Sequence, residues 1–432
     1  MEEEILTEET RREADAAPAL ISIHPLQKSI ALALGSEVRI FDLEKENAVT
    51  LTDEACSPSH SDAIRAICFG ANGSLFASAG DDKLVKVWRT DTWHCIKTVH
   101  SDKRVSAVAI SFDGLFVTFA DKFGIVWIER LEEDGQGQTS VGTKAVPLLG
   151  HYCSIITSLK FSPDGRFIAT ADRDFKIRIT VFPKCLPKGA HEIQSFCLGH
   201  TDFVSCLAFI HLADCRQSLL LSGSGDATVR LWDHVSGCLL DTCDVRKQAG
   251  LLKSNEIIKD FPAVTDINAF PDGSLVAVVI QGFHGVVILK CDFSARSIFV
   301  TKIVCMEENF MPTSLVLSSS ANMLWMVMGA SNISKSGSSE LARLLVISDV
   351  DKYVSNEQGD CPVILEDKNI PGGEKLLLKL QGSVHLAKQD AAFTAAATAV
   401  KVAMQNLLAK KQYSVEKRDL RKRNRNDRKF KK

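Results

Sequence analysis

The fold is decided by two neighbouring stretches, LGHTDFVSCLAF (residues 198–209) and LLLSGSGDATVRLWD (residues 219–233). Apolar residues alternate with polar ones through both stretches, as they do in half-buried β-strands. A Gly-His pair precedes the first strand, Ser-Gly-Ser and an aspartate divide the second stretch, and Trp-Asp ends it. This order is the signature of a WD repeat, which forms one blade of a β-propeller. A blade cannot bury both faces alone, so further copies are expected.

Copies of this unit run along most of the chain. HSDAIRAICF with ASAGDDKLVKVW (residues 60–69 and 77–88) keeps the histidine, serine, aspartate and tryptophan. Residues 149–179 keep His151 and align Asp174 with the turn aspartate, but Thr180 replaces the tryptophan. Weaker copies keep alternating strands joined by Asn-Gly or Asp-Gly, which suit tight primed turns. These pairs are Asn72-Gly73, Asp113-Gly114, Asp164-Gly165 and Asp272-Gly273. We count seven blades and predict an all-β, seven-bladed WD40 β-propeller with a C-terminal basic α-helical tail.

The count divides the chain into three predicted segments: an acidic N-terminal segment (1–18), the propeller (19–384) and a basic C-terminal helix and tail (385–432). The uncharged run 309–334 resembles a membrane span in length, but SSSAN (318–322) splits it into two strand-length pieces. We interpret it as a hairpin. The acidic start lacks the layout of a signal peptide. Thirteen cysteines without a CxxC pair favour reduced thiols in cytosol or nucleus over disulfides or zinc.

No catalytic constellation accompanies the repeats. The glycine-rich DGQGQTSVG (134–142) follows ERLEE and precedes no helical pattern, whereas a nucleotide loop leaves an apolar strand and opens a helix. The repeated polar residues are expected to hydrogen-bond one another and hold the strands together. We therefore interpret His60, Ser78, His200 and Ser222 as scaffold, and we expect no cofactor or metal on this chain.

One blade turn is unusually charged. Arg173, Asp174, Lys176 and Arg178 place four charges within six residues, in the copy that lacks the tryptophan. A cation two residues before the tryptophan position is ordinary, because another copy has Lys86 there. Exposed ion pairs contribute little to stability. From the residues alone, the cluster is either a partner-binding site or a solvated rim.

The C-terminal end combines a helical pattern with strong positive charge. Residues 386–412 are Ala-rich and lack Gly and Pro, which predicts a helix. One face of it would carry Phe393, Val400, Met404 and Leu407. From Lys410 to Lys432, twelve Lys/Arg face three acidic residues, a net charge of +9 that leaves −11 on residues 1–409. This asymmetry favours polyanion binding, although the same run also fits a nuclear localisation signal.

Several of these features occur together in one family. SPDGRFIATADRDFKIRI (162–179) and IQSFCLGHTDFVS (193–205), followed by LLLSGSGDATVRLW, resemble the non-catalytic WD-repeat subunit of the eukaryotic tRNA (guanine-N7) methyltransferase. The similarity is strongest over residues 150–233 and is supported by the basic C-terminal helix. It implies a heterodimer in which a separate Rossmann-type subunit binds S-adenosylmethionine and methylates N7 of guanine 46 in tRNA. This chain would be the scaffold that stabilises and positions the catalytic subunit.

The resemblance also assigns site residues. Arg173, Asp174, Lys176 and Arg178 fall on the family's interface with the catalytic subunit, with Arg178 ranked first. Phe175 stands where an acidic residue is expected in animal members, which removes one ion pair and offers an aromatic anchor instead. The tail would lie near the tRNA, recognised by shape and charge. Its expected tRNA contacts are Lys417, Arg418, Arg421, Lys422, Arg423 and Arg425. The expected location is the nucleus, with the cytoplasm second.

A different class of function stays open, because fold alone does not determine function. The chain would then be a WD-repeat adaptor of a ubiquitin-ligase or chromatin complex. Many ligase adaptors dock through Trp-Asp-X-Arg, but here Trp232-Asp233 is followed by His234-Val235, and Trp88 by Arg89. A methyltransferase acting alone would need a cofactor loop that the sequence lacks.

Overall fold

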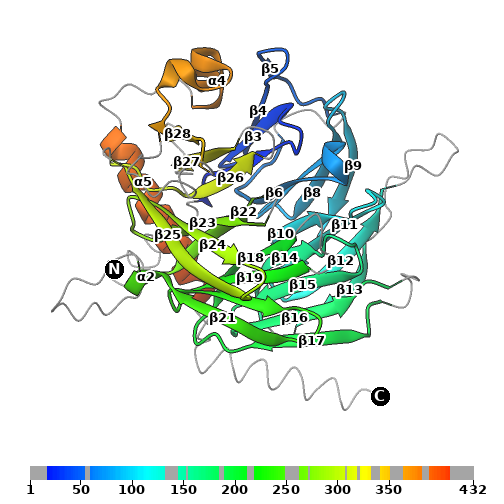
Figure 1. The fold of residues 1–432 in the computed structure, drawn as a ribbon. Helices are drawn as coiled ribbons and strands as arrows, with labels where there is room; N and C mark the ends of the chain where they lie inside the picture. Colours follow the sequence, from blue (N-terminus) through cyan, green and yellow to red (C-terminus); the bar gives the residue numbers. More distant parts are fainter. Residues whose placement is uncertain are drawn as a thin grey trace, which may run out of the picture.

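Seven antiparallel sheets follow one another around a ring in the computed structural model of the chain (Figure 1). The structure describes residues 17–53, 59–131, 145–151, 154–183, 189–211, 218–248, 262–270, 273–306, 309–318, 322–331, 341–350, 363–381 and 389–408. Strands that are adjacent in sequence are adjacent in each sheet, and the first strand of each sheet contacts the first strands of its two neighbours. The first strands therefore line the centre of the ring, and the seven-bladed prediction is confirmed.

The first six blades have four strands each, in order from the centre of the ring outward. Blade 1 is β2 (Leu20–Ile23), β3 (Ser29–Leu34), β4 (Glu37–Asp42) and β5 (Asn47–Val49). Blade 2 is β6 (Ile64–Gly70), β7 (Leu75–Gly80), β8 (Leu84–Arg89) and β9 (Cys95–His100). Blade 3 is β10 (Val105–Ile110), β11 (Phe116–Asp121), β12 (Ile125–Arg130) and β13 (Val146–Gly150). Blade 4 is β14 (Ile156–Phe161), β15 (Phe167–Asp172), β16 (Lys176–Val181) and β17 (Ile193–Leu198). Blade 5 is β18 (Val204–His211), β19 (Ser218–Ser224), β20 (Thr228–Asp233) and β21 (Cys238–Asp244). Blade 6 is β22 (Val264–Ala269), β23 (Leu275–Ile280), β24 (Gly285–Asp292) and β25 (Ser297–Cys305).

Blade 7 closes the ring with a strand from the N-terminal end. It contains β26 (Ser314–Ser318), β27 (Met323–Ser331), β28 (Leu341–Ser348) and β29 (Val363–Ile364), and β1 (Ala17–Pro18) pairs with the far end of β27. The Ala19 N–H donates to Gly329 O at 2.8 Å, and the Thr313 hydroxyl donates to Ala19 O at 2.8 Å. The N-terminal strand thus joins the inner edge of the last blade. The β26–β27 pair also confirms the predicted hairpin in the uncharged run.

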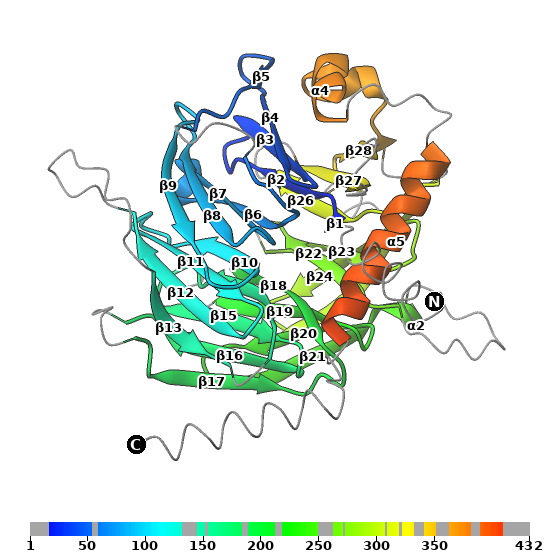
Figure 2. The ribbon, with the colours of Figure 1, turned by 180° about the vertical axis from the view of Figure 1, so that it is seen from behind.

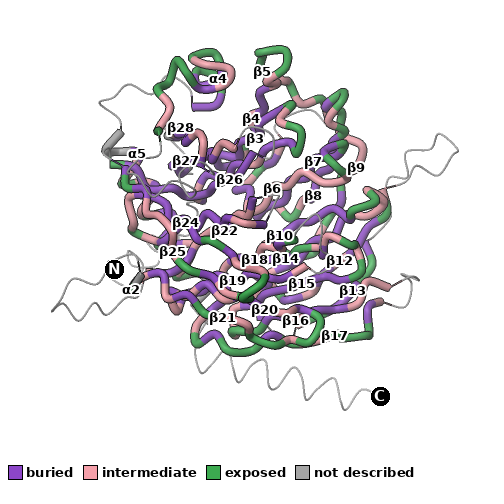
Figure 3. The backbone as a smooth tube through the Cα atoms, in the orientation of Figure 1, coloured by how far each residue is buried: buried purple, intermediate pink, exposed green. Residues whose placement is uncertain are grey.

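The core lies between neighbouring blades, as the alternation of the strands requires. At the junction of blades 4 and 5, for example, Ile177 and Ile179 pack against Leu207 and Trp232, all buried. The same pattern recurs around the ring, so the buried positions form a continuous layer inside an exposed rim (Figure 3).

The turns between first and second strands differ from the prediction. In blade 4 the Gly165 N–H donates to Ser162 O at 2.9 Å, and Gly165 has φ +68° whereas Asp164 does not have a positive φ. Both primed two-residue turns need positive φ at the first central residue, which Asp164 and Asp113 do not have, so that prediction is wrong here and at Asp113-Gly114. These hairpins use an ordinary turn followed by a left-handed glycine. At Asn72-Gly73 both residues do have positive φ.

The two longer helices pack on blades 7, 1 and 6. Short helices η1 (Ala71–Gly73), α2 (Val245–Gln248) and η3 (Asp367–Asn369) lie in connections. The helix α4 (Gly373–Leu380) buries Leu376 and Leu380 in the cluster that holds Phe41 and Trp325. The helix α5 (Gln389–Leu408) crosses blades 6 and 7 (Figure 2). Among the described residues, no helix has the length and apolar character needed to cross a bilayer.

The predicted C-terminal helix is confirmed over Gln389–Leu408. Its packed face combines Val400 with small residues, Ala392 and Ala396, which let the helix backbone approach the strands closely. The Phe393 ring packs against the His284 ring in a tilted arrangement, with ring centroids 4.9 Å apart. This described helix contains one Lys and one Asp, so it carries no net charge. The basic run from Lys410 onward lies outside the described residues.

All inner strands run in the same direction, so the hairpins between second and third strands share one face of the ring. We call this the hairpin face; it includes residues 81–83, 122–124, 173–175 and 281–284. Since His284 belongs to it and contacts Phe393, α5 lies on the same face.

Candidate functional site

The strong repeats use their polar residues to fasten strands together. In blade 5, His200 Nδ1 lies 2.9 Å from Asp226 Oδ2, and His200 Nε2 lies 2.7 Å from Ser222 Oγ. The Trp232 indole N–H donates to the same hydroxyl at 2.8 Å. Burial lowers the pKa of His200, which keeps the ring neutral at physiological pH. In blade 2, His60 makes the equivalent contacts with Asp82 and Ser78. The interpretation of these residues as scaffold is therefore confirmed.

The corresponding set in blade 4 uses a different aspartate from the predicted one. His151 Nδ1 lies 2.8 Å from Asp172 Oδ2, and Nε2 lies 2.8 Å from Thr170 Oγ1. Alignment with the other copies points to Asp174 instead, and that prediction is wrong. Asp172 is the last residue of strand β15 and contacts the histidine from there. Asp174, in the turn that follows, is therefore not needed for this contact. Its side chain is 38% exposed and its N–H donates to Ser154 Oγ at 3.3 Å.

Arg178 makes hydrogen bonds within the propeller. Its Nη1 donates to Gly150 O on β13 of blade 3 at 3.1 Å, and its Nε donates to Thr180 Oγ1 at 3.1 Å. Thr180, fully buried, thus receives the guanidinium where other copies have an indole. Burial lowers the pKa of Arg178. Arg178 therefore joins blades 3 and 4, and its role toward a partner stays a prediction.

The side chains of the other two cations, Arg173 and Lys176, make fewer contacts within the chain. The Nε of Arg173 is buried and has no hydrogen-bond acceptor within the described chain, and the nearest carboxylate oxygen, of Asp174, is 3.7 Å away. Lys176 is exposed, and its backbone N–H donates to Asp172 Oδ1 at 3.1 Å. A buried donor without an acceptor is costly unless a ligand or partner supplies one. The structure thus brings all four predicted residues to one turn and one strand.

Exposed apolar side chains border these cations. Phe175 is 41% exposed and has φ +70°, a left-handed conformation that disfavours a bulky side chain. On the outer strand β17, Phe196 pairs with Arg178 and Leu198 pairs with Lys176. Paired residues project to the same side of a sheet, so apolar and cationic groups share one surface. Phe196 and Leu198 are 45% and 60% exposed.

We define the blade 4 patch as Arg173, Asp174, Phe175, Lys176, Arg178, Phe196 and Leu198. Sequence reasoning missed Phe196 and Leu198, although IQSFCL is apolar at positions on both faces of its strand. That pattern is unusual for an outermost strand, where one face normally meets water. A mixed patch of exposed aromatic, aliphatic and cationic side chains is typical of a protein–protein interface.

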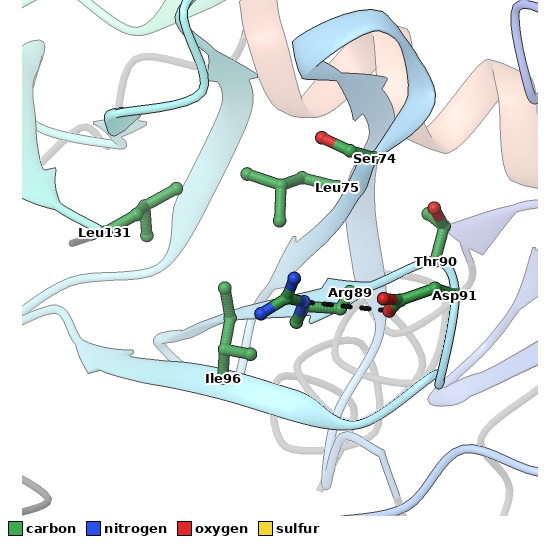
Figure 4. Close-up of a pocket in the computed structure, with 7 residues that line it drawn as sticks. All are labelled: Ser74, Leu75, Arg89, Thr90, Asp91, Ile96 and Leu131. Carbon is green, nitrogen blue, oxygen red and sulfur yellow. Dashed lines mark ion pairs between the residues drawn. The ribbon is translucent and has the colours of Figure 1, made fainter. Parts of the chain in front are cut away.

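A hollow elsewhere has a volume of ≈ 380 Å³ and lies between blades 2 and 3 (Figure 4). Its lining residues are Ser74, Leu75, Arg89, Thr90, Asp91, Ile96 and Leu131. Arg89 Nε lies 3.6 Å from Asp91 Oδ1, and both side chains are more than half exposed. This lining supplies no buried acid or base with which a reaction could be catalysed. Within the described ranges, no three His, Cys, Asp or Glu residues gather in a way that could hold a metal ion.

The predicted tRNA contacts lie outside the described residues. They are Lys417, Arg418, Arg421, Lys422, Arg423 and Arg425. Their expected role therefore rests on the sequence.

Comparison with known proteins finds one specific family. Residues 128–345 match the family described as "tRNA methyltransferase TRM82 WD40 domain", and residues 54–89 match "WD domain, G-beta repeat". A relative from Xenopus laevis, "tRNA (guanine-N(7)-)-methyltransferase non-catalytic subunit wdr4", is 32% identical over 323 residues, 72% of this chain and 75% of the relative. The relative of that name from Homo sapiens is 36% identical over 50% of each chain. The one from Dictyostelium discoideum is 32% identical over 55% of this chain and 51% of its own length. For these last two relatives, the match spans about half of their length.

Solved structures with the same fold are more distant in sequence. "Structure of U3-55K" has a TM-score of 0.57 at 18% identity, covering 72% of this chain and 91% of that one. "Crystal structure of RRP9 WD40 repeats" has a TM-score of 0.56 at 18% identity, covering 72% and 90%. At this identity the likeness supports the propeller fold alone.

Proposed function

The chain belongs to the family described as the tRNA methyltransferase TRM82 WD40 domain, and we propose that it is the non-catalytic subunit of a tRNA (guanine-N7) methyltransferase. In this role it binds a separate catalytic subunit and holds it in an active shape. S-adenosylmethionine binds to that partner, which forms 7-methylguanine at position 46 of tRNA. The propeller supplies the docking surface and carries out no chemistry.

The blade 4 patch is the observation that carries this proposal. The same turn position has positive φ in neighbouring blades, at Lys83, Gly124 and Ala227, so the left-handed conformation belongs to the repeat. Blade 4 differs in placing there an aromatic ring that is partly exposed to water. A partner that covers Phe175, Phe196 and Leu198 would bury apolar surface at the centre of the contact.

The charges of the patch define what the partner must offer. Lys176 is exposed, and the buried Nε of Arg173 needs an acceptor. A partner with carboxylates opposite these two groups would satisfy both. Asp174, released from the histidine contact, adds an acceptor for a cation of the partner. The patch therefore fits a surface with an apolar centre and charges of both signs around it.

The basic run Lys410–Lys432 supports the tRNA side of the proposal. Its twelve Lys/Arg would neutralise phosphates and release counterions, which adds affinity that salt removes. Since α5 lies on the hairpin face, the chain enters this run from the face that also bears residues 173–175. The run would also direct the protein to the nucleus, where tRNA is processed.

The test is reconstitution with a purified catalytic tRNA (guanine-N7) methyltransferase subunit. Methyl transfer from labelled S-adenosylmethionine to tRNA is expected from the mixture, and the chain alone should show none. Calorimetry of the chain with S-adenosylmethionine should show no heat of binding, because the chain has no strand-loop-helix glycine motif. Micromolar affinity of the isolated chain for the cofactor, or failure to bind the catalytic subunit, would overturn the proposal.

A further inference from the structure

Three cations from two blades converge on one buried carboxylate of the hairpin face. Arg65 Nη2 and Nε lie 2.6 and 2.8 Å from Asp81 Oδ2. Lys122 Nζ lies 3.2 Å from Asp81 Oδ1, and Arg104 Nη1 lies 3.6 Å from Oδ2. The Asp81 side chain is 2% exposed, whereas those of Lys122 and Arg104 are 34% and 46% exposed. We call these four residues the Asp81 cluster.

The position of Arg65 breaks a pattern that blades 3, 4 and 5 keep. The second residue of the inner strand is Ser106 in blade 3, Thr157 in blade 4 and Ser205 in blade 5. Each of these hydroxyls donates to a backbone carbonyl of the next blade, and so fastens the ring. Blade 2 has Arg65 at the equivalent position, and Arg65 turns to Asp81 instead. Ring closure does not need a cation here, because neighbouring blades close with a hydroxyl.

The cluster has more positive than negative charge. Three cations share one carboxylate, which leaves a net charge of +2 in a partly buried place. Burial lowers the pKa of Lys122, and the nearby Arg65 and Arg104 lower it further while Asp81 raises it. The adjacent Asp121 carboxylate accepts the Trp127 indole N–H at 2.9 Å and keeps its negative charge, and even when it is counted the three cations outnumber the acids by one. A bound anion would balance the cluster.

An exposed aromatic ring with its own cation stands beside the cluster. Phe123 follows Lys122 in the turn and is 60% exposed. Lys103, which precedes Arg104, places its Nζ 5.1 Å from the centre of the Phe123 ring. Cations beside an exposed ring are the arrangement with which proteins bind single-stranded nucleic acid, where a base stacks and the phosphate pairs with the cation.

We propose that the Asp81 cluster binds a phosphodiester of single-stranded or looped RNA, with a base on Phe123. Arg104 and Lys122 contact the phosphate, and the buried Arg65–Asp81 ion pair holds these two cations in position. The exposed ring favours RNA over an acidic peptide, which would use the cations alone. This inference rests on the proposed function only for the choice of RNA as the polyanion. The site lies on the hairpin face and would add a second RNA contact to the one expected of the basic run.

The test uses the full chain and a fluorescent 12-nucleotide oligouridylate that contains 4-thiouridine. Arg104→Gln with Lys122→Gln removes the two exposed cations and leaves Asp81 its contacts with Arg65. The matched control is Lys290→Gln with Arg296→Gln, which removes two exposed cations from blade 6. With one phosphate contact of slope about 0.7, the first pair should weaken binding roughly fivefold at 0.1 M salt. The control pair should leave affinity within about twofold.

Cross-linking separates this site from the basic tail. Irradiation should attach the oligouridylate to the peptide that contains Phe123, and Phe123→Ala should remove that product. Cross-links confined to residues 410–432, or equal loss of affinity in both variant pairs, would overturn the inference. So would displacement of the RNA from Phe123 by a decaglutamate peptide at equal concentration, since that would identify an acidic protein segment as the ligand. Binding of the catalytic subunit is measured separately. A chain that fails to bind that subunit but still cross-links at Phe123 refutes the proposed function and not the RNA site.

Discussion

Phe175 allows strain and partner contact to be separated by two substitutions. In Phe175→Gly the left-handed turn loses its penalty, because glycine adopts positive φ freely. In Phe175→Ala the penalty remains. Both variants remove the aromatic ring completely. If the ring serves the partner, the two variants should bind the catalytic subunit equally weakly, although their own stabilities differ.

The magnitudes follow from the exposure of the ring. A phenylalanine side chain presents about 200 Å², so 41% exposure leaves about 80 Å² for a partner to cover. At about 25 cal/mol per Å² this surface contributes about 2 kcal/mol to binding, or roughly 30-fold in Kd. For the isolated chain, both variants lose the part of the ring that is already buried. The glycine variant should nevertheless be about 1 kcal/mol more stable than the alanine variant.

The assay is titration of the purified catalytic subunit into each variant, with urea unfolding of the isolated chains measured alongside. Phe112→Ala is the control, because Phe112 is 59% exposed but lies in the β10–β11 turn, away from the hairpin face. It should leave Kd unchanged. The reasoning is refuted if affinity follows stability, so that the glycine variant binds markedly better than the alanine variant. It is also refuted if either variant binds like the natural chain.

Three further outcomes are expected. Arg178→Leu should lower the free energy of unfolding of the isolated chain by about 1–3 kcal/mol, because two hydrogen bonds from a charged donor are lost, and Arg178→Lys should recover partner binding better than stability; full stability of the leucine variant in urea would contradict this. Burial lowers the pKa of His200 and His234, so below about pH 6.5 the unfolded chain binds protons that the folded chain excludes, and the free energy of unfolding should fall from pH 7.5 to 5.5. His234→Gln should make that fall smaller, and an unchanged fall would show that His234 does not contribute to it. Deleting Lys410–Lys432 should leave the heterodimer intact but weaken tRNA binding and flatten its salt dependence by about 0.7–0.9 in log–log slope per lost phosphate contact; unchanged affinity with loss of nuclear accumulation alone would make the run a targeting signal.

The repeat marks allowed most of the architecture to be predicted. Each blade can be identified from local features of the sequence, namely alternating apolar and polar residues and a pair of turn residues. The strong copies add hydrogen-bonding residues such as His200, Ser222 and Trp232. Their contacts stay within one blade, so a local pattern is sufficient to predict them. The hairpin in the uncharged run and the C-terminal helix were predictable for the same reason.

The site was only half predictable. The four charges of the blade 4 turn are contiguous in sequence and can be identified from it. Which aspartate meets His151 cannot, because alignment places residues by order, whereas the hydrogen bond depends on how far Asp172 or Asp174 can reach. Phe196 was missed because its importance comes from pairing with Arg178 across two strands.

The sequence by itself determined the number and kind of blades, the charged turn and the basic end, since these depend on the chemistry of neighbouring residues. The tertiary structure alone decided what each charge meets. Arg178 contacts a carbonyl of blade 3, and Asp81 gathers cations from two blades. Closing the ring brings together residues that are far apart in the chain, and hydrogen bonds and ion pairs act only over a few ångströms. Such contacts therefore exist only once the blades are packed.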